Sequence, residues 1–276
     1  MVVFAVVSAV RARPSDDYPA VGTTVRSVVY GLIVPESITA GAILAIALGL
    51  GWWRIVTTDR QRGGPRWAAL APALLVLVAL GRLPFIDWSA KSVRYFLLLA
   101  VATLLIGVFE EFLVRGVLVV GLRRRMSEPW VWGTSSLVFG LLHLLNILAG
   151  AAVATTIVQV VFAASFGSAL YVARRTTRTI AVPVFMHALW DFGALGVIGT
   201  GGLTAGFGAL IGLGLLGLVT IGVLVFGLVA GVFVALRDNR PRRLAARWRT
   251  VPPRASLEVG DAGHGADTIP EPVAAP

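Results

Sequence analysis

The sequence predicts an all-α fold, a polytopic transmembrane helical bundle of seven to eight spans. Of its 276 residues, 57% are hydrophobic and 14% are charged, whereas a soluble globular domain carries roughly 25% charged residues. The apolar residues gather in runs of about 20 or more, the length that an α-helix needs to cross the hydrocarbon core of a bilayer. The basic residues lie in short clusters between those runs. This pattern excludes both a water-soluble fold and a disordered chain.

Seven apolar stretches are the candidate spans. They are 28–50, 67–86, 93–122, 130–149, 151–173, 179–199 and 207–236. The third is about 30 residues long, which allows it to tilt or break, and Gly116 is a candidate break point. The chain then divides into an N-terminal stub (1–26), a transmembrane helical domain (27–236) with a motif core at about 90–200, and a tail (237–276). We expect the tail to be basic at first and then disordered.

The distribution of charge predicts the orientation. The chain has 24 basic and 14 acidic residues, and its arginine clusters follow spans one, three, five and seven. The positive-inside rule makes that side cytoplasmic, so we expect a multi-pass protein of the cell membrane with its C-terminus inside and its N-terminus outside. The exception is the 81–94 connection, which places Arg82, Lys91 and Arg94 on the opposite side. We expect the basic tail to contact anionic membrane lipids and not nucleic acid.

Ionisable residues inside the spans are candidates for function, because a charged group in a bilayer costs about 2.5–3.5 kcal/mol on insertion scales. Span three contains Glu110, Glu111 and Arg115, span four contains His143, and span six contains His187 and Asp191. The chain has no cysteine, which excludes disulfide scaffolds, iron–sulfur clusters, thiolate zinc sites and cysteine nucleophiles.

The spacing of these residues indicates how they pair. Glu111 and Arg115 are four apart and share a helix face, so they form an ion pair. Glu110 points about 100° away from them, so its carboxylate is available for chemistry. His187 and Asp191 also share a face.

Depth along the helices allows the three spans to meet. Glu110, His143 and His187 lie roughly 18, 20 and 12 Å from the cytoplasmic edge at 1.5 Å per residue. Gly107, Gly116 and Gly140 flank these groups and permit close approach of the helices. We therefore expect one buried, hydrated pocket.

Such a pocket supports three kinds of chemistry. A carboxylate and an imidazole can activate water as a general base. Two histidines and carboxylates can hold Zn²⁺, which lowers the pKa of its bound water; the donors here are Glu110, His143, His187 and Asp191. A neutral histidine or a protonated acid can donate hydrogen bonds to an oxyanion. All three lead to hydrolysis of an amide or ester. The usual zinc motif, H-E-x-x-H, is absent, so local spacing does not demand the metal.

Three motifs carry a resemblance to a known family. Residues 110–115 (EEFLVR) match E-E-x-x-x-R, residues 139–143 (FGLLH) match F-x-x-x-H, and residues 187–191 (HALWD) match H-x-x-x-(N/D). In this order and in successive apolar spans, they resemble the CPBP family, which includes type II CAAX prenyl endopeptidases and the bacteriocin-processing or bacteriocin-immunity (Abi) proteins. The resemblance covers roughly residues 90–200.

The resemblance implies an intramembrane endopeptidase of about eight helices whose site opens toward the cytoplasm. It implies that Glu110 and His143 activate the water and that His187 with Asp191 steadies the oxyanion. Glu111 and Arg115 would hold the motif helix, and Phe139 would pack against His143. The family is labelled a metalloprotease, and a metal-free glutamate mechanism is also argued for it.

Asp191 leaves a choice open, because the prenyl-protease members have asparagine at this position. An ionised aspartate cannot donate to an oxyanion. Asp191 is therefore either protonated through burial, or a metal ligand, or a group that orients His187.

Two other functions fit the same residues. Intramembrane Glu, His and Asp also mark proton relays in transporters, although the chain has no internal repeat. A catalytically idle member would bind a membrane partner, for instance in bacteriocin self-immunity. For the peptidase, the expected substrate is a peptide or a membrane protein.

Overall fold

The computed structural model describes residues 21–59, 63–202 and 206–238, and every regular element within them is a helix. Seven helical stretches are long and apolar enough to cross a membrane; they are Val25–Gly49, Arg66–Phe85, Val93–Leu122, Glu128–Ala149, Val153–Thr177, Ala181–Gly199 and Phe207–Arg237. The predicted all-α transmembrane bundle is confirmed, with seven spans in the described residues. Most of the predicted stub (1–26) and tail (237–276) lies outside those residues.

The helices follow one another with short connections. In chain order they are α2 (Val25–Val28), η2 (Val29–Ile33), α3 (Val34–Gly49), α4 (Trp53–Thr57), η3 (Arg66–Ala69), α5 (Leu70–Leu80), η4 (Leu83–Phe85), α6 (Val93–Glu111), η5 (Phe112–Leu118), α7 (Val119–Leu122), α8 (Glu128–Leu142), η6 (His143–Ala149), α9 (Val153–Thr177), α10 (Ala181–Gly199) and α11 (Phe207–Arg237).

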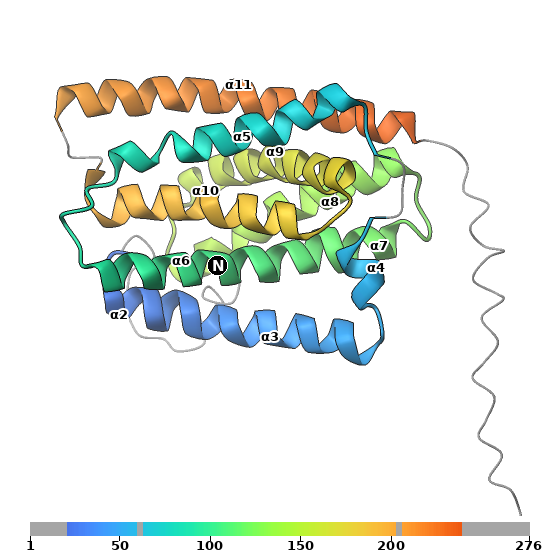
Figure 1. The fold of residues 1–276 in the computed structure, drawn as a ribbon, viewed down its shortest axis with the longest axis horizontal. Helices are drawn as coiled ribbons and strands as arrows, with labels where there is room; N and C mark the ends of the chain where they lie inside the picture. The colour runs from blue at the N-terminus through green and yellow to red at the C-terminus, as the bar shows by residue number, and fades with distance from the viewer. Residues whose placement is uncertain (1–20, 60–62, 203–205, 239–276) are drawn as a thin grey trace, which may run out of the picture. The chain divides into compact units, whose positions relative to one another are not determined.

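Helix α9 is the central element of the bundle. It packs against α8, α11, α10 and α5, while α6 packs against α10 on one side and α3 on the other (Figure 1). The main apolar core lies where α5, α9 and α10 meet and includes Leu75, Phe166, Leu170 and Met186. Of the three helices that carry the motifs, α8 and α10 pack against α9, and α6 packs against α10.

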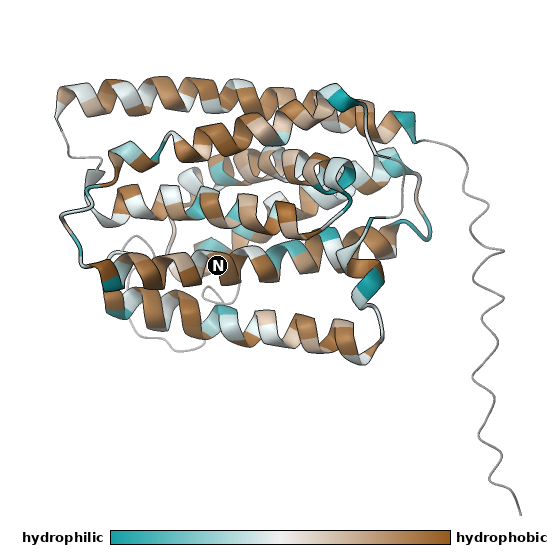
Figure 2. Ribbon diagram, in the orientation of Figure 1, coloured by the Kyte–Doolittle hydropathy of each residue, from teal (hydrophilic) through white to brown (hydrophobic). Residues whose placement is uncertain are grey.

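The outer faces of the bundle are apolar. Large apolar side chains such as Val161, Phe185 and Leu218 are more than 60% exposed, and Figure 2 shows hydrophobic residues along the whole length of the outer helices. Exposed apolar surface of this extent is incompatible with water and fits contact with lipid chains. Several ionisable residues of the spans, namely Glu36, Glu110, Glu111, Arg115 and His187, are instead buried inside the bundle.

The third span does not break at Gly116, and the prediction of a break there is wrong. Helix α6 continues into a π-helical segment, η5, and then into α7. A π-helical turn keeps the backbone hydrogen-bonded while it widens the helix, and unsatisfied backbone groups are costly in a bilayer. Gly116 instead allows close approach: a Cβ there would lie 2.5 Å from Cγ1 of Val56. The π segment begins directly after Glu110 and Glu111.

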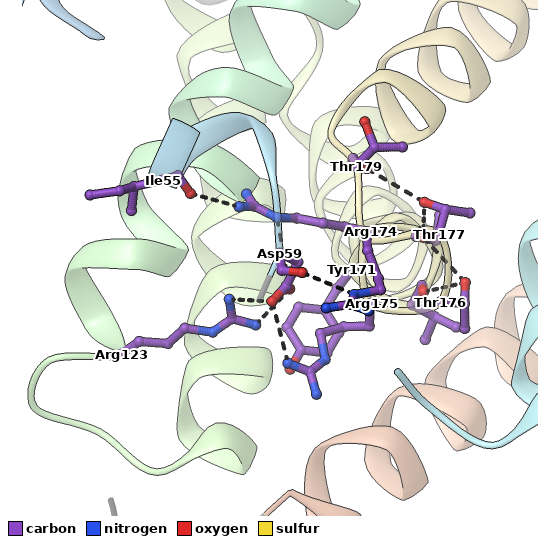
Figure 3. Close-up of polar contacts among 12 residues, drawn as sticks. Ile55, Asp59, Arg123, Tyr171, Arg174, Arg175, Thr176, Thr177 and Thr179 are labelled. Atoms are coloured by element: carbon purple, nitrogen blue, oxygen red, sulfur yellow. Dashed lines mark hydrogen bonds and ion pairs between the residues drawn. The ribbon is translucent and has the colours of Figure 1, made fainter. Parts of the chain in front are cut away.

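Buried ion pairs join four connections at one end of the bundle. Figure 3 shows Asp59 among the guanidinium groups of Arg123, Arg174 and Arg175. The Nη2 atom of Arg123 lies 3.0 Å from Oδ2 of Asp59 and 2.6 Å from Oε1 of Glu128. Arg175 pairs with Glu128 at 3.4 Å and with Asp238 at 2.9 Å. These contacts join the segment after α4, the end of α7, the start of α8 and the ends of α9 and α11. The described parts of the predicted arginine clusters therefore lie at one end of the bundle; residues 60–62 and 239–276 lie outside the described part of the chain.

Asp59 is the acidic centre of this ion-pair network. Burial would raise the pKa of the Asp59 carboxyl, but the guanidinium groups of Arg123, Arg175 and Arg174 outweigh burial and hold that pKa below its usual value. The adjacent residue, Thr58, forms an antiparallel bridge with Thr179. The segment between the first two spans is thus fastened to the loop between α9 and α10.

Candidate active site

Two pairs of helices in the motif core approach closely because each pair has a glycine at its contact. A Cβ on Gly107 of α6 would lie 2.7 Å from the carbonyl oxygen of Val184 in α10. On α8, a Cβ on Gly140 would lie 2.5 Å from the carbonyl oxygen of Val160 in α9. The predicted close approach at these glycines is confirmed. It places the last turn of α6, with its two glutamates, directly beside His187.

Glu111 connects two parts of the site. Its Oε1 atom accepts a hydrogen bond from Nη1 of Arg115 at 2.8 Å. The same oxygen lies 3.2 Å from Nδ1 of His187 on α10. A carboxylate can only accept, so Nδ1 of His187 carries a proton in this contact. The predicted Glu111–Arg115 pair is present, and it also fixes the orientation of the imidazole.

The other ring nitrogen of His187 faces two carboxylates. Its Nε2 atom is 3.8 Å from Oε2 of Glu110 and 3.6 Å from Oδ2 of Asp191. Three of the four predicted catalytic residues therefore converge on one point. Glu110, Glu111 and His187 are buried, while the side chain of Asp191 is 22% exposed. The cluster is closed on the side of Glu111 and open beside Asp191.

Phe139 is the aromatic centre of the site. Its ring is fully buried and lies under the guanidinium of Arg115, whose Cζ is 4.1 Å from the ring centroid. The rings of His143 and His187 meet it edge-on, at centroid distances of 5.4 and 5.6 Å. The predicted packing of Phe139 against His143 is present, and Phe139 in addition contacts His187 and Arg115.

His143 lies at the point where α8 ends and the 3₁₀ segment η6 begins. Its Nδ1 atom is 3.0 Å from the carbonyl oxygen of Phe139. A carbonyl can only accept, so Nδ1 donates and the neutral ring keeps its lone pair on Nε2. Within the part of the chain that the structure describes, His143 forms no hydrogen bond or ion pair with Glu110, His187 or Asp191. It joins the site through the shared contact with Phe139.

Two side chains outside the predicted set of site residues, Phe166 and Arg82, lie against the site. Phe166 of α9 meets the ring of His187 at 5.4 Å and that of Trp190 at 4.9 Å. Arg82, at the end of α5, places its Cζ 3.6 Å from the centre of the Trp190 ring. Phe166 gives no sequence signal, because one phenylalanine in an apolar span is ordinary. Arg82 does give one, as an exception to the positive-inside pattern.

The geometry of the described residues gives no separate support for a zinc ion at this site. A catalytic zinc takes three protein ligands. Among residues 21–59, 63–202 and 206–238, no group of three or more His, Cys, Asp or Glu side chains is positioned to hold a metal ion. Nδ1 of His187 is engaged by Glu111, which leaves Nε2 as the ring nitrogen that could bind a ligand. The predicted zinc site at Glu110, His143, His187 and Asp191 stays a prediction.

Comparison with known proteins bears on the same segment. Residues 92–193 match the family of type II CAAX prenyl endopeptidase, Rce1-like, proteins. This segment, called the Rce1-like match below, is similar to that family. It contains every motif residue discussed above, and it confirms the resemblance drawn from the three motifs at about 90–200. Neither the curated proteins nor the solved structures give a significant match to the chain.

The Rce1-like match coincides with the helices that build the cluster. It begins at the N-cap residue of α6, Ser92, whose hydroxyl accepts from the backbone N–H of Tyr95. It ends at Gly193, two residues after Asp191. Helices α3, α5 and α11 lie outside the match and pack around it. The family and the seven apolar spans together support a protease of the membrane.

Proposed function

We propose that this protein is an intramembrane endopeptidase that hydrolyses a peptide bond with a water activated by Glu110 and His143. The observation that carries the proposal is the convergence of Glu110, His187 and Asp191 within the Rce1-like match, inside a bundle of apolar helices. Buried charges in a membrane span are retained where they have a function. A carboxylate beside an imidazole can act as general base and general acid in hydrolysis.

In the first step, the Glu110 carboxylate takes a proton from a water molecule. The lone pair on Nε2 of His143 accepts a hydrogen bond from the same water and orients it. The water oxygen attacks the carbonyl carbon of the scissile bond, and the carbonyl oxygen becomes an oxyanion. Three carboxylates face the ring nitrogens of His187 and favour its imidazolium form, so Nε2–H of His187 can donate to the oxyanion.

In the second step, the tetrahedral intermediate collapses. The carbon–nitrogen bond breaks, and the leaving amine takes the proton held by Glu110. The products are a carboxylic acid and an amine, and the side chains return to their starting states. Of the three roles open to Asp191, orienting His187 is the one that its 3.6 Å separation from Nε2 supports. No step is routed through a metal ion, and treatment with a chelator tests that choice.

The orientation of the protein in the membrane follows from the end of the bundle that contains the ion-pair network around Asp59. Arg123, Arg174 and Arg175 all lie there, and the positive-inside rule places this end in the cytoplasm. We therefore propose a protein of the cell membrane with a cytoplasmic C-terminus and a site reached from the cytoplasm. The substrate is a peptide or a membrane protein.

Cleavage of peptides by the full chain, purified and reconstituted in liposomes, tests the proposal. The panel contains a prenylated CAAX peptide and unprenylated leader-type peptides, with products identified by mass spectrometry. We expect Glu110→Gln and His143→Ala to abolish cleavage. Glu36→Gln is the matched control, because Glu36 is another buried glutamate of a membrane helix, outside the site. Wild-type cleavage by Glu110→Gln would contradict the mechanism.

The same variants separate the alternative functions. Proton-coupled uptake by liposomes that contain the wild type, without peptide cleavage, would favour a transporter. Protection against a bacteriocin that survives Glu110→Gln would favour a catalytically idle immunity protein. Either result would overturn the peptidase.

A further inference from the structure

A small groove lies at the end of the bundle that contains the ion-pair network around Asp59, which is called the arginine end below. The groove has a volume of about 130 Å³ and lies between α4 and the last turns of the third span. Figure 1 shows α4 beside α7 at this end. The lining residues are Trp52, Ile55, Val56, Val117, Val120, Gly121 and Arg124. None of them belongs to the cluster around His187, so the groove is a separate feature of the molecule.

The wall that α4 forms is held in place by its inner contacts. Val56 of α4 is buried, and a Cβ on Gly116 of η5 would lie 2.5 Å from its Cγ1 atom. The carbonyl oxygen of Ile55 accepts a long hydrogen bond, 3.5 Å, from Nη2 of Arg174 on α9 (Figure 3). Helix α4 is therefore packed against the π segment and bonded to the central helix, and the groove has a defined shape.

Arg124 is the charged residue of the lining, and it is exposed. Within the part of the chain that the structure describes, its side chain forms no hydrogen bond or ion pair. Its neighbour Arg123 differs, because that guanidinium is bound to Asp59 and Glu128 inside the network. A guanidinium presents N–H donors whose geometry matches the oxygens of a phosphate. Arg124 therefore offers a cationic group to a ligand in the groove.

The charges at the arginine end are sorted between inside and outside. Asp59 and Glu128 are buried and bound to arginines, whereas Arg54, Arg124 and Arg125 are exposed. None of the described residues that line the groove is acidic. The surface around the groove is therefore cationic. Basic residues at the end of membrane spans attract the anionic headgroups of the adjacent leaflet.

The interior of the groove is apolar. Trp52, Ile55 and Val120 line it, and tryptophan is typical of the headgroup level of a membrane. A phospholipid combines the two properties that this groove requires, because it carries a phosphate next to hydrocarbon chains. Inorganic phosphate would leave the apolar wall without a partner, and a lipid without net charge would gain less from Arg124.

We propose that the groove between α4 and α7 binds one anionic phospholipid. Its phosphate contacts the guanidinium of Arg124, and the upper part of one acyl chain lies against Ile55 and Val120. The remainder of the lipid stays in the bilayer, in contact with the apolar outer face of the bundle. The proposal does not depend on the proposed peptidase function, because it concerns a different surface and is tested without a peptide substrate.

Lipid titration of the purified, delipidated full chain in detergent tests the proposal. Native mass spectrometry measures bound lipid, and thermal unfolding measures the stabilisation that binding causes. Phosphatidylglycerol is the anionic probe. Phosphatidylcholine with the same acyl chains lacks the net negative charge, and glycerol phosphate lacks the chains. We expect phosphatidylglycerol to bind most tightly and to raise the unfolding temperature most.

Three variants assign the binding to the groove. Arg124→Gln removes the cationic group, and we expect it to weaken binding of phosphatidylglycerol by about fivefold. Val120→Phe fills the groove without a change of charge and should also weaken that binding. Arg125→Gln is the matched control, because Arg125 is the next residue, is also exposed and does not line the groove. It should bind the lipid as the wild type does.

The outcomes that would overturn the proposal are distinct. Equal losses of binding in Arg124→Gln and Arg125→Gln would show diffuse attraction to the surface and no site. Equal stabilisation by phosphatidylcholine would show that the anionic charge is not recognised, and equal stabilisation by glycerol phosphate would show that the chain is not. Unfolding without lipid shows which variants are folded. If Val120→Phe does not fold, the comparison of the two arginine variants still decides.

Discussion

Glu111 and His187 are 76 residues apart in the chain, yet Oε1 of Glu111 lies 3.2 Å from Nδ1 of His187. The same oxygen accepts from Arg115 at 2.8 Å. The arginine, the glutamate and the histidine therefore form one chain of charge-assisted contacts from η5 to α10. Such contacts are stronger than those between neutral groups, and this chain fixes which nitrogen of His187 faces Glu110.

Glu111→Gln should lower kcat with little effect on KM. The substitution keeps the shape of the side chain but removes the charge that holds Nδ1 of His187. A hydrogen bond to a charged group is worth about 1.5–3 kcal/mol, which corresponds to about 10- to 100-fold in rate. Steady-state kinetics in liposomes measure the effect. Glu36→Gln, another buried glutamate, should retain the wild-type kcat; equal kcat values for the two variants would show that Glu111 does not orient the imidazole.

Phe139→Leu should reduce both stability and cleavage. Leucine fills much of the volume but loses the cation–π contact with Arg115 and the edge contacts with His143 and His187. We expect a loss of about 1–3 kcal/mol in the free energy of unfolding, measured by thermal unfolding in detergent. Phe185→Leu is the control, since Phe185 is 63% exposed on the lipid side of α10. A Phe139→Leu variant as stable and active as this control would contradict the role of the ring.

The sequence predicts the spans and the contacts within each helix, because both follow from local periodicity. Runs of apolar residues locate all seven helices. The i,i+4 spacing predicts the Glu111–Arg115 pair and the shared face of His187 and Asp191, and both are present. The glycines at 107 and 140 predict close helix approach, which the structure also contains.

Contacts between helices could not be predicted from the sequence, because they depend on how each helix is rotated about its axis. The Glu111–His187 contact, the packing of Phe166 on His187 and the stacking of Arg82 on Trp190 are of this kind. The sequence does not predict the π-helical segment after Glu111 either, since Gly116 indicates a weak point of the helix but not its form. One partial signal existed, namely a basic residue, Arg82, on the side where basic residues are scarce.

Asp59→Asn should destabilise the arginine end of the bundle. It should also reduce the loss of stability that the wild type shows as the pH is lowered. The pKa of Asp59 is lowered in the folded protein, so its stabilisation is complete above the unfolded value of about 3.9 and is lost as the pH falls through the lower folded value. The wild type should therefore unfold at lower temperature below about pH 4. At neutral pH the variant should lose about 3–5 kcal/mol, because Arg123 and Arg174 lose a buried partner.

Thermal unfolding of the wild type and of Asp59→Asn, measured from about pH 3 to about pH 7, tests this prediction. The range includes the unfolded pKa of aspartate, about 3.9. Asp87→Asn is the control, because Asp87 lies in an exposed turn where Ser89 and the backbone of Ala90 donate to it. This control should keep the wild-type stability at neutral pH. An Asp59→Asn variant with the full acid dependence of the wild type would show that Asp59 does not carry it.

Gly107→Ala should separate the glutamates from His187 without removing any polar group. The added Cβ would lie 2.7 Å from the carbonyl oxygen of Val184 and 3.4 Å from the backbone nitrogen of Ala188. These are backbone atoms of a packed helix, so α6 and α10 must move apart. Overpacking of this kind costs about 1–3 kcal/mol in the free energy of unfolding. The cleavage rate should fall by more than this loss of stability alone would explain. General base catalysis requires the reacting groups to lie within hydrogen-bond distance, and the movement of the helices separates them.

Gly121→Ala is the matched variant for this experiment. Gly121 lies in α7 of the same span, and a Cβ there meets nothing within 4 Å. Alanine in a helix is favoured over glycine by about 1 kcal/mol, so this variant should be at least as stable as the wild type and fully active. Thermal unfolding and cleavage in liposomes, measured on both variants, separate the two effects. Full activity in Gly107→Ala would mean that the close approach of α6 and α10 is not what brings the catalytic groups together.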